Sequence, residues 1–420
     1  MNSGQNPEPY PASRASASSE PAQPTELPVW PVQPTWPTKP TWQQLRARML
    51  PAWFRRTGHK FATLAYPLPF GARISAGRLP PAGPVWFGSV MGTSMMAMLA
   101  GLYELRALAI PMLFLNLVLV TYLCGSFTRQ CAKDPGVLLQ NISDGAIIPY
   151  WGLVAMGLMS TGSSTLIVLP MLSYRLLPAA HAVDIGMWIA GSAIGFISAF
   201  GFAGMLMKNN LGRPVPAWGL PLVSPMVTAT TSAAMSDGVQ GIHMKMFLLT
   251  IGVLGFFLAW ILGIIVFGVT YEYAWFEKPL PDILATSTFI PLGIIGQSAA
   301  AAQVLQSRIG IFMTPDAAEA LESIALWYGA ILLLTGMPLL LWAMFFSYRA
   351  FARKAPFVPG WWAMTFPVGT CSLGALYMSW DVSAALLFAL LGAHWLLCAV
   401  ASVQAIAAQR SRGTKAVDNA

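Results

Sequence analysis

Charged residues are scarce in this sequence of 420 residues. Asp, Glu, Lys and Arg together make up 10% of the chain, whereas hydrophobic residues make up 56%. Because soluble domains carry about 25% charged residues, this composition excludes an ordinary soluble protein. The mean hydropathy of +0.60 instead predicts a polytopic membrane protein.

Residues typical of metal sites and covalent catalysis are also few. The chain has four cysteines and four histidines. The cysteines form no CxxC pair, and the histidines are scattered along the chain. A GxxxxGK[ST] loop is absent, which argues against ATP hydrolysis by the usual phosphate-binding route. Since no set of His, Asp and Glu residues converges on one stretch, we do not expect an enzyme.

Long apolar windows dominate the part of the chain between residues 80 and 407. Windows of about 20 residues, the length that crosses ~30 Å of hydrocarbon, can be placed there ten times. We therefore predict an all-α integral membrane protein in which residues 80–407 form a ten-helix transmembrane transporter domain. The expected helices are 82–103, 107–127, 147–170, 184–206, 216–235, 246–270, 284–306, 322–347, 358–379 and 383–406.

The two ends of the chain have a different composition. Residues 1–79 include "PVWPVQPTWPTKPTW", with proline at every third position, and a basic, aromatic stretch after it. The three-residue period is typical of polyproline II, and basic aromatic stretches favour a membrane surface. We expect residues 1–79 to be a disordered, Pro-rich cytoplasmic tail with a basic juxtamembrane segment, and residues 408–420 to be a cytoplasmic C-terminal tail.

Lys and Arg residues are unevenly distributed between the two sides of the expected membrane domain. With the N-terminus inside, only Arg106, Arg175, Lys245 and Arg308 of the 24 Lys and Arg residues fall in outer segments. Cytoplasmic loops are enriched in Lys and Arg, so we expect a multi-pass protein of the cell (plasma or inner) membrane with both termini in the cytoplasm. The net charge of +8 then reflects topology, and we expect no nucleic-acid partner.

Small and hydroxyl residues occur in every second window. The odd windows contain "FGSVMGTSMM", "MGLMSTGSSTL" and "VTATTSAAMS", whereas even windows such as "FFLAWILGIIVF" are bulky and apolar. Lipid offers hydroxyls no hydrogen-bond partner, so we expect five helical hairpins around a central pore, with odd helices inner and even helices outer. Close packing is the alternative explanation of the small residues, as in the GxxxG pair Gly88 and Gly92.

The odd windows also supply a candidate path for an anion. A mobile anion needs weak, repeated donors in place of its hydration shell, and prolines can break helices and free backbone groups. Phe366, beside Pro367, is the candidate gate, although it could also be a packing residue. The candidate pore-lining residues are Ser94, Ser163, Ser164, Thr228, Thr231, Phe289, Ser298, Thr365 and Thr370, and the candidate helix breaks are Pro221, Pro225, Pro291 and Pro367.

Ionisable residues are missing from the central halves of the odd windows. Because intramembrane ionisable groups usually mark coupling sites, their absence favours a channel or uniporter, while a carrier of a protonated dicarboxylate stays possible. His394, in an even window, is expected to be a packing histidine with satisfied hydrogen bonds. Asp184 and Glu322 are expected to be solvated carboxylates near helix ends.

Several stretches resemble the tellurite-resistance/dicarboxylate transporter (TDT) family, within the voltage-dependent, slow-type anion channel superfamily. They are "GPVWFGSVMGTS" (83–94), "PAWGLPLVSPMVTATT" (216–231), "PLGIIGQSAAA" (291–301) and "PFVPGWWAMTFPVGT" (356–370), and they look most like the malate permease and sulfite exporter branch. The resemblance implies ten helices around a pore, a homotrimer with one pore in each subunit, and no metal or organic cofactor. It also implies that Phe366 matches the phenylalanine that occludes the pore of channel members.

From these features we expect transmembrane transport of a small anion through a hydroxyl-lined pore that a phenylalanine gates. The expected partners are a small anionic substrate, namely a C4-dicarboxylate such as malate or a sulfite-like oxyanion, and the lipid bilayer. One alternative is a chloride or nitrate channel. Another is a membrane sensor or scaffold that acts through the Pro-rich tail and transports nothing.

Overall fold

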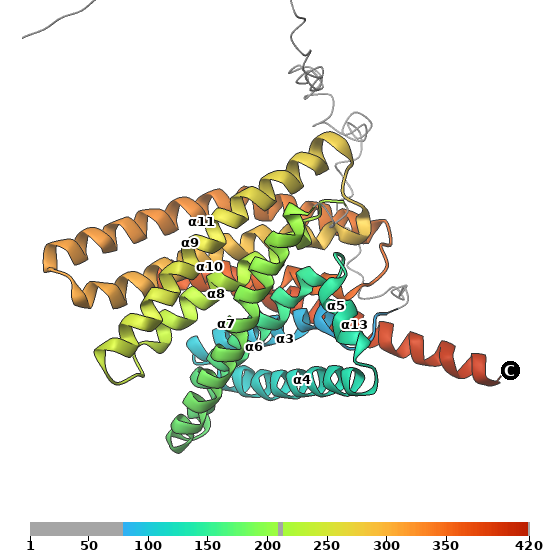
Figure 1. Ribbon diagram of the computed structural model, residues 1–420, viewed down its shortest axis with the longest axis horizontal. Coiled ribbons are helices and arrows are strands. Elements are labelled where there is room, and N and C mark those ends of the chain that lie inside the picture. The colour runs from blue at the N-terminus through green and yellow to red at the C-terminus, as the bar shows by residue number, and fades with distance from the viewer. Residues whose placement is uncertain (1–78, 209–212, 419–420) are drawn as a thin grey trace, which may run out of the picture. The chain divides into compact units, whose positions relative to one another are not determined.

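The structure, a computed structural model, describes residues 79–208 and 213–418 (Figure 1). Almost all of the expected N-terminal tail lies outside the described residues. The described part is all-helical and contains no strand. Its α-helices are α3 (Phe87–Leu102), α4 (Arg106–Lys133), α5 (Gly136–Ser143), α6 (Trp151–Leu172), α7 (Leu177–Met207), α8 (Leu220–Met235), α9 (Ile242–Glu272), α10 (Ile290–Ile309), α11 (Pro315–Ala352), α12 (Phe366–Tyr377) and α13 (Asp381–Asp418).

3₁₀ segments of four or more residues precede three of these helices. They are the 3₁₀ segments η5 (Pro216–Gly219) before α8, η7 (Asp282–Phe289) before α10 and η9 (Pro359–Met364) before α12. Within the described residues, eight helical segments are long and apolar enough to cross a membrane. The windows 216–235 and 358–379 are not among them. Their α-helices, α8 and α12, have 16 and 12 residues.

Burial divides the long helices into two sets. Most residues of α3, α6, α8, α10 and α12 are buried. The other set, α4, α7, α9, α11 and α13, buries only one stripe of each helix. In α4 the stripe is Ala109, Leu113, Asn116, Val120 and Leu123, a spacing of three and four residues that keeps one face of a helix inward.

Large apolar side chains cover the outside of the exposed helices. Ile197 on α7 and Trp327 on α11 are each 72% exposed. Water would disfavour such a surface, whereas hydrocarbon accepts it at no cost because lipid tails are as apolar as leucine. The exposed stripes of these helices therefore suit contact with lipid.

The five buried helices contact one another in a closed circuit. In chain order α3 packs on α6, α6 on α8, α8 on α10, α10 on α12, and α12 returns to α3. Each exposed helix packs against two members of this circuit; for example, α4 contacts α3 and α6, and α9 contacts α8 and α10. Figure 1 shows α10 running beside α9 and α11. Helices that are close in sequence therefore alternate between enclosed and covering positions.

Glycines allow the enclosed helices to approach closely. A Cβ atom added to Gly296 of α10 would overlap the backbone of Thr370 and Cys371 on α12, and one added to Gly152 of α6 would overlap the backbone at Leu220 and Pro221. The GxxxG pair behaves similarly. A Cβ atom added to Gly88 would overlap the side chain of Trp362 in η9, and one added to Gly92 would overlap the side chain of Thr365. Close packing thus explains many of the small residues in the odd windows.

Substitution of Gly296 tests this contact. We expect Gly296→Ala to destabilise the protein by about 1–3 kcal/mol, because the added methyl group meets backbone that cannot rotate away. The thermal midpoint of the detergent-solubilised protein, followed by size-exclusion chromatography, should fall. Gly125→Ala on α4 is the matched control, since nothing lies within 4 Å of its added Cβ. An equal midpoint for the two variants would contradict the packing explanation.

Candidate functional site

The predicted helix breaks are mostly helix beginnings. Pro221, Pro291 and Pro367 each occupy the first or second position of their helix, where the missing N–H group has no partner in any case. Pro367 lies directly after such a break, because α12 starts at Phe366 and the residues before it form η9.

Pro225 is different because it lies inside α8. A proline at this position removes the backbone hydrogen bond to the carbonyl of Pro221, four residues earlier. The Ser224 hydroxyl donates to that carbonyl at 2.8 Å. The hydroxyl of Ser224 thus replaces the missing donor to the Pro221 carbonyl, and α8 continues without interruption.

Seven of the eight candidate hydroxyls donate to a backbone carbonyl three or four residues earlier in the chain. Thr365 donates to Trp362 O at 2.7 Å, and Thr370 donates to Pro367 O at 2.8 Å. Because a hydroxyl has only one hydrogen, these groups offer lone pairs rather than hydrogens to the interior in this conformation. The same holds for Ser94, Ser164, Thr228, Thr231 and Ser298, each of which donates to a carbonyl three or four residues earlier.

Two of the candidates come together at one methionine. The hydroxyls of Thr228 and Thr231 on α8 lie 3.4 Å and 3.9 Å from the Met159 sulfur on α6, and Ser192 Oγ on α7 lies 3.5 Å from it. The other candidates are spread over α3, α6, α10 and α12. Thr231 and Ser163 are half-buried, whereas Ser94, Ser164, Thr228, Ser298, Thr365 and Thr370 are fully buried.

Polar pairs between helices include residues that the sequence did not single out. Gln297 on α10 donates through Nε2 to Thr230 Oγ1 on α8 at 2.8 Å, while its Oε1 is buried without a partner. Asn116 on α4 donates to Thr161 Oγ1 on α6 at 2.9 Å. An amide within an apolar window was the signal that could have marked both residues.

The candidate gate Phe366 is 2% exposed at the start of α12. It belongs to an enclosed helix, so its ring does not lie on the lipid-facing surface. Phe289, which holds the corresponding place before α10, is fully buried, and its ring meets the imidazole of His394 edge-on at 5.4 Å. This contact directs Phe289 toward the covering helix α13.

His394 links two covering helices to the break before α12. Its Nδ1 lies 3.2 Å from Met364 O in η9, and its Nε2 lies 2.9 Å from the Tyr348 hydroxyl on α11. Since a carbonyl only accepts, Nδ1 carries the hydrogen, and Nε2 of the neutral ring accepts from Tyr348. Both nitrogens are therefore satisfied, as expected of a packing histidine.

Charged groups are absent from the interior of the enclosed helices that the structure describes. Apart from Arg308 in the last turn of α10, these five helices contain no Asp, Glu, Lys or Arg. Asp184 was expected to be solvated, but it is 5% exposed. Its Oδ1 would lie only 2.6 Å from a Cβ atom added to Gly162 of α6, so the carboxylate packs against that helix. The expectation was wrong because α7 begins at Leu177, so Asp184 lies two turns inside the helix. Glu322 is exposed, as expected.

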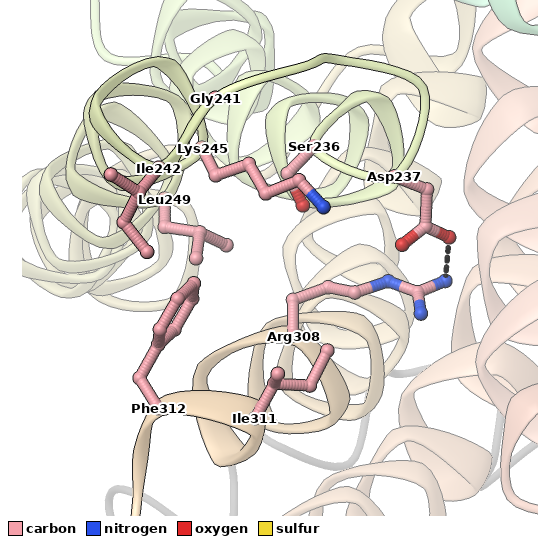
Figure 2. Close-up of a pocket in the computed structure, with 9 residues that line it drawn as sticks. All are labelled: Ser236, Asp237, Gly241, Ile242, Lys245, Leu249, Arg308, Ile311 and Phe312. Carbon is pink, nitrogen blue, oxygen red and sulfur yellow. Dashed lines mark ion pairs between the residues drawn. The ribbon is translucent and has the colours of Figure 1, made fainter.

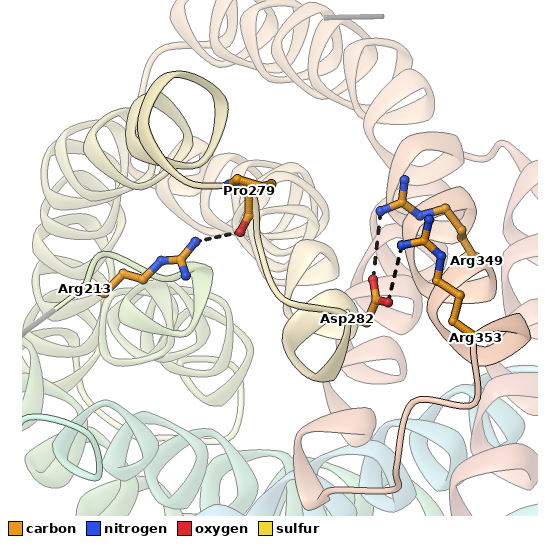
Figure 3. A network of polar contacts seen from close by, with 5 residues as sticks. All are labelled: Arg213, Pro279, Asp282, Arg349 and Arg353. Carbon is orange, nitrogen blue, oxygen red and sulfur yellow. Dashed lines mark hydrogen bonds and ion pairs between the residues drawn. The ribbon is translucent and has the colours of Figure 1, made fainter. Parts of the chain in front are cut away.

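Arginines gather at the end of the bundle where α8 and α10 begin (Figure 3). Arg213 donates through Nη2 to Lys278 O and Pro279 O, both at 2.7 Å. Asp282 lies 3.4 Å from Arg353 and 3.9 Å from Arg349. Asp282 thus holds the start of η7 to the end of α11, and Arg213 holds the segment before α8 to the residues that precede η7.

Comparisons with known proteins identify the family of this chain. Residues 82–408 match the SLAC1 family, which is described as voltage-dependent anion channel. The sulfite efflux pump SSU1 of Arthroderma benhamiae and that of Trichophyton rubrum are each 23% identical over 316 residues, which is 70% of this chain and 81% of the relative. The pump of Arthroderma otae is 24% identical over 204 residues, 46% of this chain and 53% of its own.

The family match covers most of the chain, and proteins of this family are transporters or channels rather than enzymes. The described helices supply the apolar surface that a membrane protein needs. This chain therefore belongs to the SLAC1 family of anion channels and transporters.

Proposed function

We propose that this protein carries a small oxyanion of the sulfite type across the membrane, along a path enclosed by α3, α6, α8, α10 and α12. The closed circuit of these five buried helices, without a charged residue in their central parts, is the observation that carries the proposal. The relatives named sulfite efflux pumps favour sulfite over malate, chloride or nitrate. They also favour export as the direction.

Ten crossings are compatible with the helix lengths. The segments η5 with α8 and η9 with α12 each span about 30 Å, because 3₁₀ turns rise ~2.0 Å and α-helices ~1.5 Å per residue. This length matches the hydrocarbon thickness. In the proposed arrangement, five hairpins each give one enclosed and one covering helix, both termini lie in the cytoplasm, and three subunits form a homotrimer with one path each.

Hydroxyls that already donate to helix carbonyls favour passage of an anion over its tight binding. A hydroxyl that turns toward an anion must give up its hydrogen bond to the helix carbonyl, so the net gain of each contact is small, about 1 kcal/mol. Weak contacts repeated along a path let an ion enter and also leave. Ser94, Ser163, Ser164, Thr228, Thr231, Ser298, Thr365 and Thr370 are the proposed path hydroxyls.

Phe366 is the proposed gate of this path. Its ring is buried on an enclosed helix and starts that helix, so a rotation about its side-chain bonds moves apolar bulk without breaking a helical hydrogen bond. Phe289 has a different proposed role, because its ring packs on His394 and supports the wall.

Flux assays with purified protein in liposomes test the transport function. We expect sulfite to move faster than malate, chloride or nitrate under equal gradients, because the relatives that match over most of this chain are sulfite pumps. Each anion is measured separately against protein-free liposomes. Preference for malate would reassign the substrate, and no flux of any of the four anions would remove the transport proposal.

Removal of the Phe366 ring tests the gate. We expect Phe366→Ala to raise sulfite flux by about tenfold, equivalent to ~1.4 kcal/mol of barrier, because the apolar plug is lost. Phe289→Ala is the matched control, a buried phenylalanine before the neighbouring proline-started helix, and should not raise flux. Unchanged flux in a Phe366→Ala protein that elutes normally would show that this ring is only a packing residue.

Substitution of His394 tests whether its hydrogen bonds to Tyr348 and Met364 stabilise the segment before α12. We expect His394→Ala to lower stability by about 1–3 kcal/mol, because the Tyr348 hydroxyl and the Met364 carbonyl would both lose a buried partner. Tyr348→Phe removes one of the two bonds and should cost less. Thermal midpoints in detergent give the order, and a larger loss for Tyr348→Phe than for His394→Ala would contradict the assigned hydrogen bonds.

A further inference from the structure

A cavity of about 280 Å³ lies where α8 and α10 end and α9 begins (Figure 2). Lys245 and Arg308 contribute two cations to its lining, and Asp237 contributes one carboxylate. Apolar side chains, including Ile242 and Phe312, lie on the other side of the gap in Figure 2. The cavity is thus a mixed site with an excess of one positive charge.

Arg308 has donor capacity that the ion pair does not use. Its Nη2 pairs with Asp237 Oδ2, while its Nε is buried and has no hydrogen-bond partner. A buried donor without a partner is costly, and a guanidinium group binds oxyanions through adjacent N–H groups. Arg308 lines the cavity, so its guanidinium group can pair with an oxyanion there in addition to Asp237.

Lys245 occupies a position that helix stability does not favour. It lies in the first turn of α9, which begins at Ile242, and the positive end of a helix dipole repels a cation there. It is half-buried, and within the described residues its amino group has no carboxylate within 4.0 Å. Figure 2 shows its amino group reaching over the gap above Arg308.

The start of α9 has no side-chain cap. Its N-cap residue is Gly241, with φ of +90°, which has no side chain to accept a hydrogen bond from the first N–H groups of the helix. The uncapped start of α9, Lys245 and Arg308 all line the same cavity. Each of these groups separately favours an anion.

We propose that this cavity binds a small oxyanion between the start of α9, Lys245 and Arg308. Sulfur oxyanions and phosphates have the required charge and several acceptor oxygens, and the volume admits one of them. The oxyanion comes either from solution or from the headgroup of an anionic phospholipid, whose chains the apolar side of the cavity could accept. The binding is independent of the proposed transport function, and only its effect on flux rests on that function.

The location suggests a role at one mouth of the path. The cavity lies at the C-terminal ends of α8 and α10, two of the five enclosed helices, opposite the arginine network at their starts. Two of the four basic residues expected on the outer side, Lys245 and Arg308, meet here. An oxyanion held at this mouth is positioned to enter the path or to leave it.

Three substitutions separate anion binding from a merely structural ion pair. Arg308→Gln and Lys245→Gln should each raise the dissociation constant for sulfite at least threefold, measured by calorimetry on lipid-free protein in neutral detergent. Asp237→Asn should lower it, because the carboxylate that competes for Arg308 is removed. If the ion pair is only structural, Asp237→Asn and Arg308→Gln should instead change the dissociation constant for sulfite in the same direction. Lys245→Gln leaves that pair intact and keeps the test valid if Arg308→Gln fails to fold.

Two further measurements identify the source of the oxyanion. Sulfite and inorganic phosphate are added to lipid-free protein, and phosphatidylglycerol is compared with phosphatidylcholine as an additive, with the thermal midpoint as readout. Stabilisation by the free anions supports a solution ligand, and stabilisation by phosphatidylglycerol alone supports a headgroup. Arg106→Gln, an exposed outer-segment arginine, is the control and should bind as the unmodified protein does.

Absence of stabilisation by all of these additives would overturn the inference, as would equal binding by the unmodified protein and Lys245→Gln. In sulfite-transporting liposomes, Lys245→Gln should raise the half-saturating concentration at least threefold while the maximal rate is kept. Loss of transport with retained binding would reject the proposed function and leave the oxyanion site standing.

Discussion

Hydrocarbon supplies neither hydrogen-bond partners nor counter-charges, and this constraint explains most of the structure. Every polar group that the chain brings into the bundle must find its partner within the protein. The hydroxyls of the enclosed helices therefore bond to carbonyls of their own helices, and Ser224 replaces the bond that Pro225 removes. The central parts of the enclosed helices carry no charge among the described residues, because an unpaired charge there would be costly.

Close approach of the backbones follows from the same constraint. Without a hydrophobic driving force between helices in lipid, association depends on van der Waals contact and on interhelical hydrogen bonds. Gly152 and Gly296 bring neighbouring enclosed helices together at the point of contact. Interhelical bonds such as that from Gln297 to Thr230 add to the contact. The interior that results is tight, polar in places and uncharged, which is the environment that the proposed oxyanion path requires.

Positive charge is left to the two ends of the bundle. At one end Arg213, Arg349 and Arg353 are tied to backbone carbonyls and to Asp282. At the other end Lys245 and Arg308 border a cavity, and the Arg308 Nε has no partner. A neutral interior between cationic ends suits a protein that attracts anions without retaining them, since strong binding within the path would slow release.

The class of the protein and the order of its enclosed and covering helices follow from the sequence alone. Composition excluded a soluble fold, and the alternation of hydroxyl-rich with bulky windows agrees with the observed burial of α3, α6, α8, α10 and α12. These features depend on whole segments, because a window of 20 residues averages over single side chains. Family membership was also visible, since its motifs are local stretches such as 356–370.

Single side-chain environments were decided only by the tertiary structure. A hydropathy window cannot place the start of a helix to within a turn, so Asp184 was taken for a solvated end residue although α7 begins at Leu177 and buries it. The prolines were predicted to be helix breaks, and only the structure shows that Pro291 and Pro367 lie at helix starts whereas Pro225 lies inside α8. Lys245 and Arg308 line the same cavity although they are 63 positions apart in the sequence. Their proximity depends on how α8, α9 and α10 pack, which no local pattern records.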